Sequence, residues 1–123
     1  MRLILLLCVA GAMGVLVRFA VMKMTAGASF PWGTIVVNLL GCFLFGVILV
    51  VLPRHFNLTR ESEIGVVLLA GFMGALTTFS TYAFDLYSLY EQGRWGAMTG
   101  YFSIQNGGGM LLFCLGLVTG KFY

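Results

Sequence analysis

The sequence predicts an all-α membrane protein with four transmembrane helices. Hydrophobic residues make up 60% of the 123 positions and charged residues only 9%, whereas a typical soluble domain is about a quarter charged. A small soluble domain buries only about two-thirds of the surface that its chain exposes, so a core of this size could not hide so much apolar surface. We therefore expect most side chains to face lipid.

Four hydrophobic runs are each long enough to cross a bilayer, which takes about 20 mainly apolar residues. They cover residues 3–24, 33–52, 64–90 and 96–120. Helix breakers and charges lie between them, since 25–32 contains Gly, Ser and Pro, and 53–63 gathers a Pro and most of the loop charge. We expect a single transmembrane domain over 1–123.

The first run invites a comparison with a signal peptide, because Arg2 precedes LILLLCVAGA and LLLC has a faint likeness to a lipoprotein cleavage motif. The apolar run continues past Ala12 to Val17, however, and the residues just before Cys8 are leucines rather than small residues. We therefore expect a retained helix.

Positive charge gives little orientation signal. With four spans, one side of the membrane carries Arg2, Arg54, Arg60 and Lys121. The other side carries Lys23, Arg94 and, if its side chain reaches the surface, Arg18. Because basic residues on short loops normally fix which side faces the cytoplasm, this balance predicts insertion in both orientations. The alternative is that one or two residues, such as Arg2 and Arg60, decide it.

Several function classes find no support in the sequence. The seven basic residues are scattered along span ends without a cluster, which disfavours nucleic-acid binding. Cys8, Cys42 and Cys114 lie in apolar spans without a CxxC or a paired histidine, so we interpret them as small buried residues rather than disulfides or metal ligands. No catalytic Ser-His-Asp set or phosphate-binding glycine loop occurs, so we do not expect an enzyme.

Polar side chains within the spans need an explanation, because they are costly in a bilayer. Each could simply join two helices through a hydrogen bond of about 0.6 kcal/mol. A chain without catalytic groups has little other use for so many, so we favour a permeation pathway. The set comprises Asn38, Thr77, Thr78, Ser80, Thr81, Asp85, Tyr101, Ser103, Gln105 and Asn106.

The centre of the third span favours a break in the helix. The midpoint of residues 64–90 is Thr77, within GALTTFSTY. Two β-branched threonines after Gly74 are poor helix formers, and a break at this depth needs protein or water to satisfy the freed carbonyls. If two copies insert antiparallel, their breaks would meet at the dimer axis, where unwound carbonyls could hold a cation.

Two aromatic residues follow this break. Phe79 and Tyr82 are three residues apart and share a helix face. Aromatic ring edges carry partial positive charge, so the pair could attract a small anion weakly, and weak binding favours conduction. The alternative is that both rings are ordinary packed side chains.

Three stretches of the chain resemble the small four-helix fluoride channels known as the Fluc or CrcB family. They are GAMGVLVRF (11–19), GTIVVNLLGCFLFG (33–46) and GFMGALTTFSTYAFD (71–85). The resemblance implies an antiparallel, dual-topology dimer with two pores, embedded in the lipid of a bacterial-type plasma (inner) membrane. Such a channel exports fluoride passively and protects the cell, because HF enters uncharged and the anion is then trapped inside.

The resemblance also assigns roles to individual residues. It implies a fluoride path lined by Asn38, Phe79, Ser80, Tyr82 and Tyr101. Pore or vestibule positions are implied for Arg18, Thr34, Thr81, Asp85 and Gly109. It further implies a structural sodium ion (Na+) at the dimer interface, held by the backbone carbonyls of Gly74 and Thr77.

The chain departs from the family pattern at several of these positions. Tyr82 stands where Phe is usual, Ala83 replaces a common serine, and Gly109 and Phe113 stand where a serine and a threonine are expected. Some family members pair two non-identical subunits, so a heterodimer with a paralogue is an alternative to a homodimer. A non-conducting membrane partner subunit and a proton-coupled exporter that uses Asp85 are further alternatives.

Overall fold

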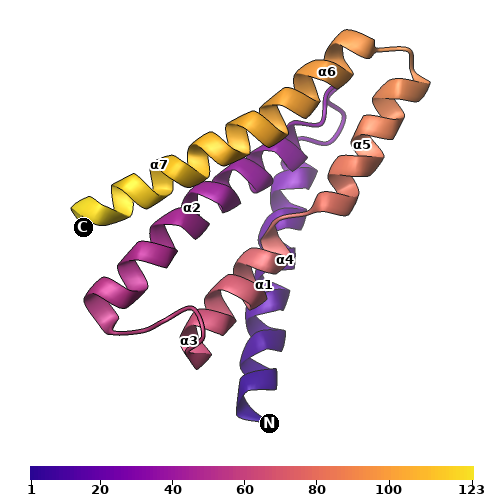
Figure 1. Cartoon of the computed structure of the whole chain (residues 1–123). Coiled ribbons are helices and arrows are strands. Elements are labelled where there is room, and N and C mark those ends of the chain that lie inside the picture. Colours follow the sequence, from indigo (N-terminus) through magenta and orange to yellow (C-terminus); the bar gives the residue numbers. More distant parts are fainter.

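All 123 residues are described by a computed structural model, and every regular element in it is a helix (Figure 1). The elements are α1 (Arg2–Met24), α2 (Trp32–Phe56), α3 (Glu63–Val66), the π-helical η1 (Val67–Met73), α4 (Gly74–Leu76), α5 (Phe79–Glu91), α6 (Trp95–Ser103), the π-helical η2 (Ile104–Gly108) and α7 (Gly109–Phe122). Four helical segments are long and apolar enough to cross a membrane: Arg2–Met24, Trp32–Phe56, Glu63–Glu91 and Trp95–Phe122. The predicted class, an all-α protein with four spans, is confirmed.

The second span is longer than predicted at its C-terminal end. It runs through Pro53 to Phe56, where the sequence suggested an end at residue 52. Proline lacks the N–H that the helix ladder uses, but only one turn follows it here. The helix then ends at Asn57, which adopts the left-handed conformation (φ 50°) that asparagine tolerates better than most residues.

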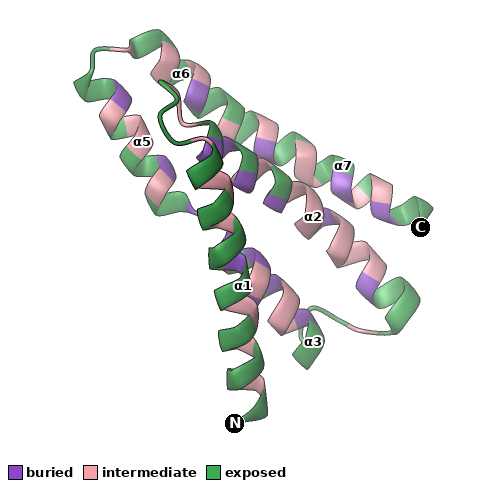
Figure 2. Ribbon diagram, turned by 180° about the vertical axis from the view of Figure 1, so that it is seen from behind, coloured by how far each residue is buried: buried purple, intermediate pink, exposed green.

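Glycines allow α2 and α7 to lie side by side with their backbones in contact (Figures 1 and 2). A Cβ atom at Gly46 would lie 2.4 Å from the carbonyl oxygen of Phe113, and one at Gly116 would lie 2.2 Å from that of Phe43. On the other side of the molecule, Gly14 of α1 approaches the carbonyl oxygen of Phe72 in the same way. Small residues at helix contacts are the usual means of close packing in membranes.

Replacing Gly116 with Ala is therefore expected to destabilise the fold, because the new methyl group would overlap a backbone atom rather than a movable side chain. Overpacking of this kind costs about 1–3 kcal/mol. The expected result is a lower midpoint of thermal unfolding in detergent. The matched control is Gly96→Ala, since no atom lies within 4 Å of a Cβ there. Equal midpoints for the two variants would contradict the close contact of α2 with α7.

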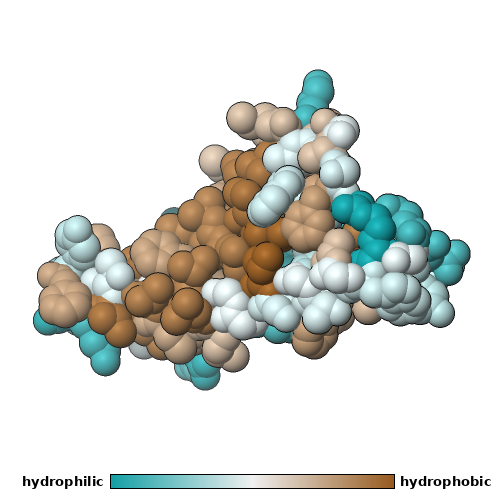
Figure 3. Space-filling view, turned by 90° about the horizontal axis from the view of Figure 1, so that it is seen from above, coloured by the Kyte–Doolittle hydropathy of each residue, from teal (hydrophilic) through white to brown (hydrophobic).

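The buried core is small and divided into two clusters. Only 20 of the 123 residues are buried (Figure 2), so much of the apolar surface remains for lipid or for another chain. One cluster joins Ile35, Tyr82, Leu89 and Tyr101, and the other joins Val37, Met73 and Leu76. Figure 3 shows hydrophobic side chains gathered in the middle of the molecule and hydrophilic ones toward its extremities. The two clusters lie on either side of an interruption in the third span.

Candidate functional site

The third span is interrupted between α4 and α5. Thr77 (φ −79°, ψ 156°) and Thr78 (φ −148°, ψ 115°) have extended backbones, and α5 begins at Phe79. In an unbroken helix the Thr78 N–H would donate to the carbonyl of Gly74. Here it donates instead to Oδ1 of Asn38, at 2.8 Å. The carbonyl of Gly74 is thereby left without that helical donor.

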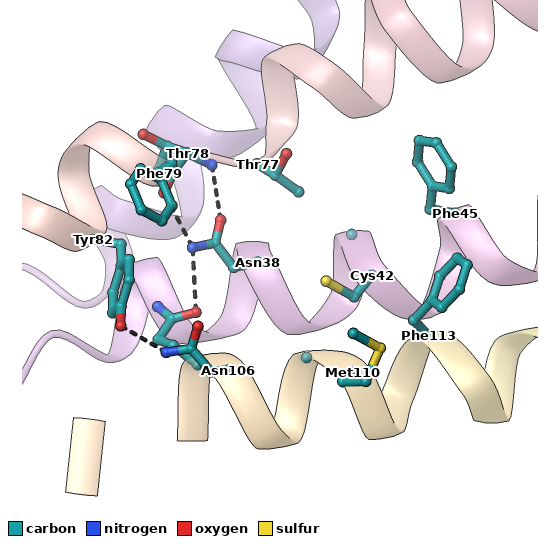
Figure 4. A pocket seen from close by; sticks show the side chains of 13 residues that line it. Asn38, Cys42, Phe45, Thr77, Thr78, Phe79, Tyr82, Asn106, Met110 and Phe113 are labelled. Atoms are coloured by element: carbon teal, nitrogen blue, oxygen red, sulfur yellow. Dashed lines mark hydrogen bonds between the residues drawn. The ribbon is translucent and has the colours of Figure 1, made fainter. Parts of the chain in front are cut away.

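Asn38 bonds both backbone polar groups of Thr78 and replaces the helical acceptor that the Thr78 N–H loses at the break (Figure 4). Its Oδ1 accepts from the Thr78 N–H, and its Nδ2 donates to the Thr78 carbonyl at 3.1 Å. Backbone polar groups at membrane depth must find partners within the protein or in water. The side-chain amide of Asn38 in α2 therefore stabilises the interruption of the third span.

The hydroxyl of Thr78 caps the N-terminus of the next helix, α5. Its Oγ1 accepts from the Thr81 N–H at 3.3 Å and lies 2.9 Å from the Thr81 hydroxyl and 3.4 Å from that of Ser80. This is an N-cap, which satisfies one of the free N–H groups of the first turn. Of the predicted pathway hydroxyls, Ser80 and Thr81 thus lie beside a capping residue at the start of α5, and Ser80 is exposed.

A chain of side-chain hydrogen bonds runs from the break to an acidic residue. Asn38 Nδ2 also donates to Gln105 Oε1 (3.3 Å), and Gln105 Nε2 donates to the Tyr101 hydroxyl (3.2 Å). That hydroxyl donates to Asp85 Oδ2 (2.8 Å), which also accepts from Thr34 Oγ1 (2.7 Å). The network therefore brings together Asn38, Tyr101, Asp85 and Thr34. Gln105 links Asn38 to Tyr101; it belongs to the polar set of the spans but was given no individual role.

Beside the break lies a cavity of about 430 Å³, which we call the break pocket. Figure 4 shows side chains from α2, from the break, from α5 and from the fourth span around it. Its predicted lining residues are Asn38, Thr77, Phe79, Tyr82 and Gly109. Thr78, Gln105 and Asn106 also line it; they belong to the polar set of the spans but were given no individual role. Cys42 and Met110 are lining residues that were not predicted for the site. None of the residues lining the pocket carries a charge.

The two aromatic residues of the break pocket differ in exposure. Phe79 and Tyr82 meet edge to face, with ring centroids 5.5 Å apart, and Tyr82 also lies 5.4 Å from the ring of Tyr101. Tyr82 is 5% exposed, whereas Phe79 is 78% exposed. The ring of Phe79 thus projects from the surface of the chain, at the depth where the third span is interrupted.

Other predicted residues lie outside this pocket. Thr34 and Asp85 line a second cavity of about 280 Å³, near Arg94 and the loop between α1 and α2. Tyr101 is fully buried, and its hydroxyl joins Asp85 of the second cavity to Gln105 of the break pocket. Arg18 lines neither cavity and donates from Nη1 to the Thr77 carbonyl at 3.2 Å.

Four spanning helices with a polar network between them define a multi-pass integral membrane protein. Residues 5–117 match the family model described as "CrcB-like protein, Camphor Resistance (CrcB)". The chain therefore belongs to the CrcB family, which confirms the resemblance seen in the sequence.

Relatives of the chain are similar over nearly its whole length. The chain is 44% identical over 124 residues to the "Fluoride-specific ion channel FluC" of Nitratidesulfovibrio vulgaris, with 98% of both chains covered. It is 42% identical over 113 residues to the protein of the same name from Nitrosococcus oceani, with 89% of each covered. With that of Solidesulfovibrio magneticus it shares 40% over 118 residues, covering 94% of this chain and 93% of the relative.

Proposed function

We propose that this chain forms a fluoride-selective channel that lets the ion cross the membrane passively and so protects the cell from fluoride. The names of its relatives support this, and none of those names describes an enzyme. The observation that carries the proposal is the break pocket itself. It combines amide and hydroxyl groups with two aromatic rings at the interruption of a spanning helix, and its lining is uncharged.

An uncharged lining suits conduction of an anion. A fixed cation would hold a small anion strongly, whereas a conducting site must bind well enough to admit the ion and weakly enough to release it. Ring edges carry partial positive charge, and the rings of Phe79 and Tyr82 line the break pocket together with Asn38. Amide, hydroxyl and ring-edge donors together would replace part of the water around fluoride without trapping it.

We also propose that the working unit is an antiparallel dimer of this chain. Ser80 and Asn106 are exposed polar residues of the third and fourth spans, and lipid cannot satisfy exposed polar groups. A second copy would cover them, and the even distribution of basic residues permits both orientations. A heterodimer with a paralogue would cover the same surface, and the departures at Ala83, Gly109 and Phe113 favour testing that alternative.

The break also offers oxygen atoms for the proposed sodium ion. The Gly74 carbonyl has lost the Thr78 N–H as a helical donor, and Gly74 is exposed. The Thr77 carbonyl accepts from Arg18 and keeps a second lone pair. Hard cations prefer oxygen ligands, so Gly74 and Thr77 of two chains fit such an ion. Bound there, sodium would join the two copies and offset the charge on their facing carbonyls.

The cellular location we propose is the bacterial plasma (inner) membrane, because the proposed task is to release fluoride trapped in the cytoplasm. The four spans and the relatives establish only that the chain is a multi-pass membrane protein. Contact with membrane lipid follows from the many exposed apolar side chains of the spans, such as Leu5, Leu16 and Leu111.

Liposomes that contain this chain alone are expected to release fluoride and to retain chloride. A fluoride electrode and a chloride electrode measure the two effluxes, and protein-free liposomes are the control. If the inserted protein releases no fluoride, the homodimer is contradicted. If fluoride release then recovers when a paralogous chain is added, the heterodimer is established. Accumulation of fluoride driven by an imposed pH gradient would instead support a proton-coupled exporter that uses Asp85.

A further inference from the structure

Asn106 in η2 makes two hydrogen bonds with one nitrogen atom. Its Nδ2 donates to the Tyr82 hydroxyl at 2.7 Å and to the carbonyl of Phe102 at 2.8 Å (Figure 4 shows the first). Asn106 is exposed on the chain, whereas Tyr82 is 5% exposed. The pair joins α5 to the fourth span at the edge of the break pocket.

The direction of the bond between Asn106 and Tyr82 follows from the second partner. The nitrogen and oxygen of an asparagine amide are assigned from their surroundings. The Phe102 carbonyl can only accept, so the amide atom 2.8 Å from it must be the nitrogen. That same atom lies 2.7 Å from the Tyr82 oxygen. The Tyr82 oxygen therefore accepts from Asn106, and its own proton stays available.

The hydroxyl of Tyr101 differs from that of Tyr82 in its hydrogen bonds. The Tyr101 hydroxyl accepts from Gln105 and donates to Asp85, so both its oxygen and its proton have hydrogen-bond partners inside the protein. The Tyr82 hydroxyl makes one hydrogen bond, in which it is the acceptor. It is thus a buried O–H group with an unused proton, on a residue that lines the break pocket.

We propose that the Tyr82 hydroxyl is an anion-binding donor of the break pocket and that Asn106 is the positioning residue that orients it. A hydroxyl that accepts a hydrogen bond becomes a better donor, because neighbouring hydrogen bonds polarise one another. A bond to an anion is in turn stronger than one to a neutral acceptor. Phenylalanine at position 82 would offer only its ring edge. The identity of the anion as fluoride rests on the proposed function.

The Tyr82→Phe variant tests the donor. It removes the proton and keeps the ring, so the channel is expected to conduct still but to bind the ion less well. The half-saturating fluoride concentration for release from liposomes should rise about tenfold, as expected for the loss of one hydrogen bond to a charged partner. An unchanged half-saturating concentration would overturn the proposal.

The positioning role of Asn106 is tested both in the wild-type chain and in the Tyr82→Phe variant. Asn106→Leu, which cannot donate, should raise the half-saturating concentration in the wild-type chain but should add nothing to Tyr82→Phe, because the residue would act only through the hydroxyl. An additive effect would overturn that role. The control is Thr119→Ala, since the Thr119 hydroxyl bonds only the Leu115 carbonyl of its own helix and Thr119 lines neither cavity; it should match the wild type.

A binding measurement separates this proposal from the proposed function. In protein labelled with ¹³C at the tyrosine Cζ atoms, the Tyr82 resonance is identified by its loss in Tyr82→Phe. We expect sodium fluoride to shift this resonance and sodium chloride to leave it in place. If the wild-type chain releases no fluoride, the proposed function fails for the chain alone, and a shift still supports the donor. No shift with fluoride overturns it.

Discussion

Replacing Asn38 with Asp is expected to reduce fluoride release from liposomes by about a hundredfold or more. Asn38 Nδ2 supplies protons to the Thr78 carbonyl and to Gln105 Oε1. An aspartate oxygen in its place would face two acceptors and hold the break less well. A negative charge about 4 Å from the passing anion would also cost about 4 kcal/mol at an effective dielectric constant of about 20, which alone exceeds a hundredfold.

The matched control for Asn38→Asp is the same substitution at Asn57. Asn57 lies at the C-terminal end of α2, in the left-handed conformation that aspartate also tolerates, and it lines neither cavity. Asn57→Asp should therefore release fluoride at the wild-type rate. Both variants should elute from size-exclusion chromatography as the wild type does. Fluoride release by Asn38→Asp at the wild-type rate would refute a pathway through the break pocket.

The parts of the fold that the sequence predicts are those set by local chemistry. The four spans follow from hydropathy and length, which depend on neighbouring residues alone. The sequence also directs attention to Gly74, Thr77 and Thr78, where weak helix formers lie in the middle of a span and where the backbone is extended at both threonines. The boundary at Pro53 was less predictable, because one lost hydrogen bond near a helix end is easily tolerated.

The contacts of the site depend on how the helices are rotated against one another. The spacing of residues within one helix does not reveal which residues of another helix they contact. Gln105 lies four residues after Tyr101, which indicates one helix face, but nothing in the spacing shows that Asn38 would be its other partner. The bond from Asn106 to Tyr82 depends on the π-helical stretch η2, which changes the rotation of the fourth span.

Arg18 illustrates what a resemblance leaves open. The resemblance implied that Arg18 lies in the pore or its vestibule. In the structure, Arg18 donates to the carbonyl of Thr77, one of the two oxygens proposed for sodium. A charged group and a cation that share one carbonyl repel each other. In the proposed dimer, the side chain of Arg18 would therefore have to move away from this carbonyl for the proposed sodium ion to bind there.

Replacing Phe79 with Ile is expected to reduce fluoride release about tenfold while leaving the fold intact. The ring is 78% exposed, so its removal takes away little buried packing. What it does remove is an aromatic ring whose centroid lies 5.5 Å from that of Tyr82, in the break pocket that Asn38 also lines. The electrostatic preference of a ring edge is worth about 0.5–1.5 kcal/mol in pairs of aromatic rings. We expect a loss of similar size for the ion, and about 1.4 kcal/mol is a factor of ten.

Phe84→Ile is the control for this prediction, because it makes the same change on the same helix outside the pocket. Phe84 is 67% exposed and lines neither cavity, so this variant should release fluoride as the wild type does. Equal rates for both variants would mean that the ring at the break matters no more than an exposed ring outside the pocket. Since a non-conducting partner subunit predicts that equality, the pair of variants decides between a channel and a packing role.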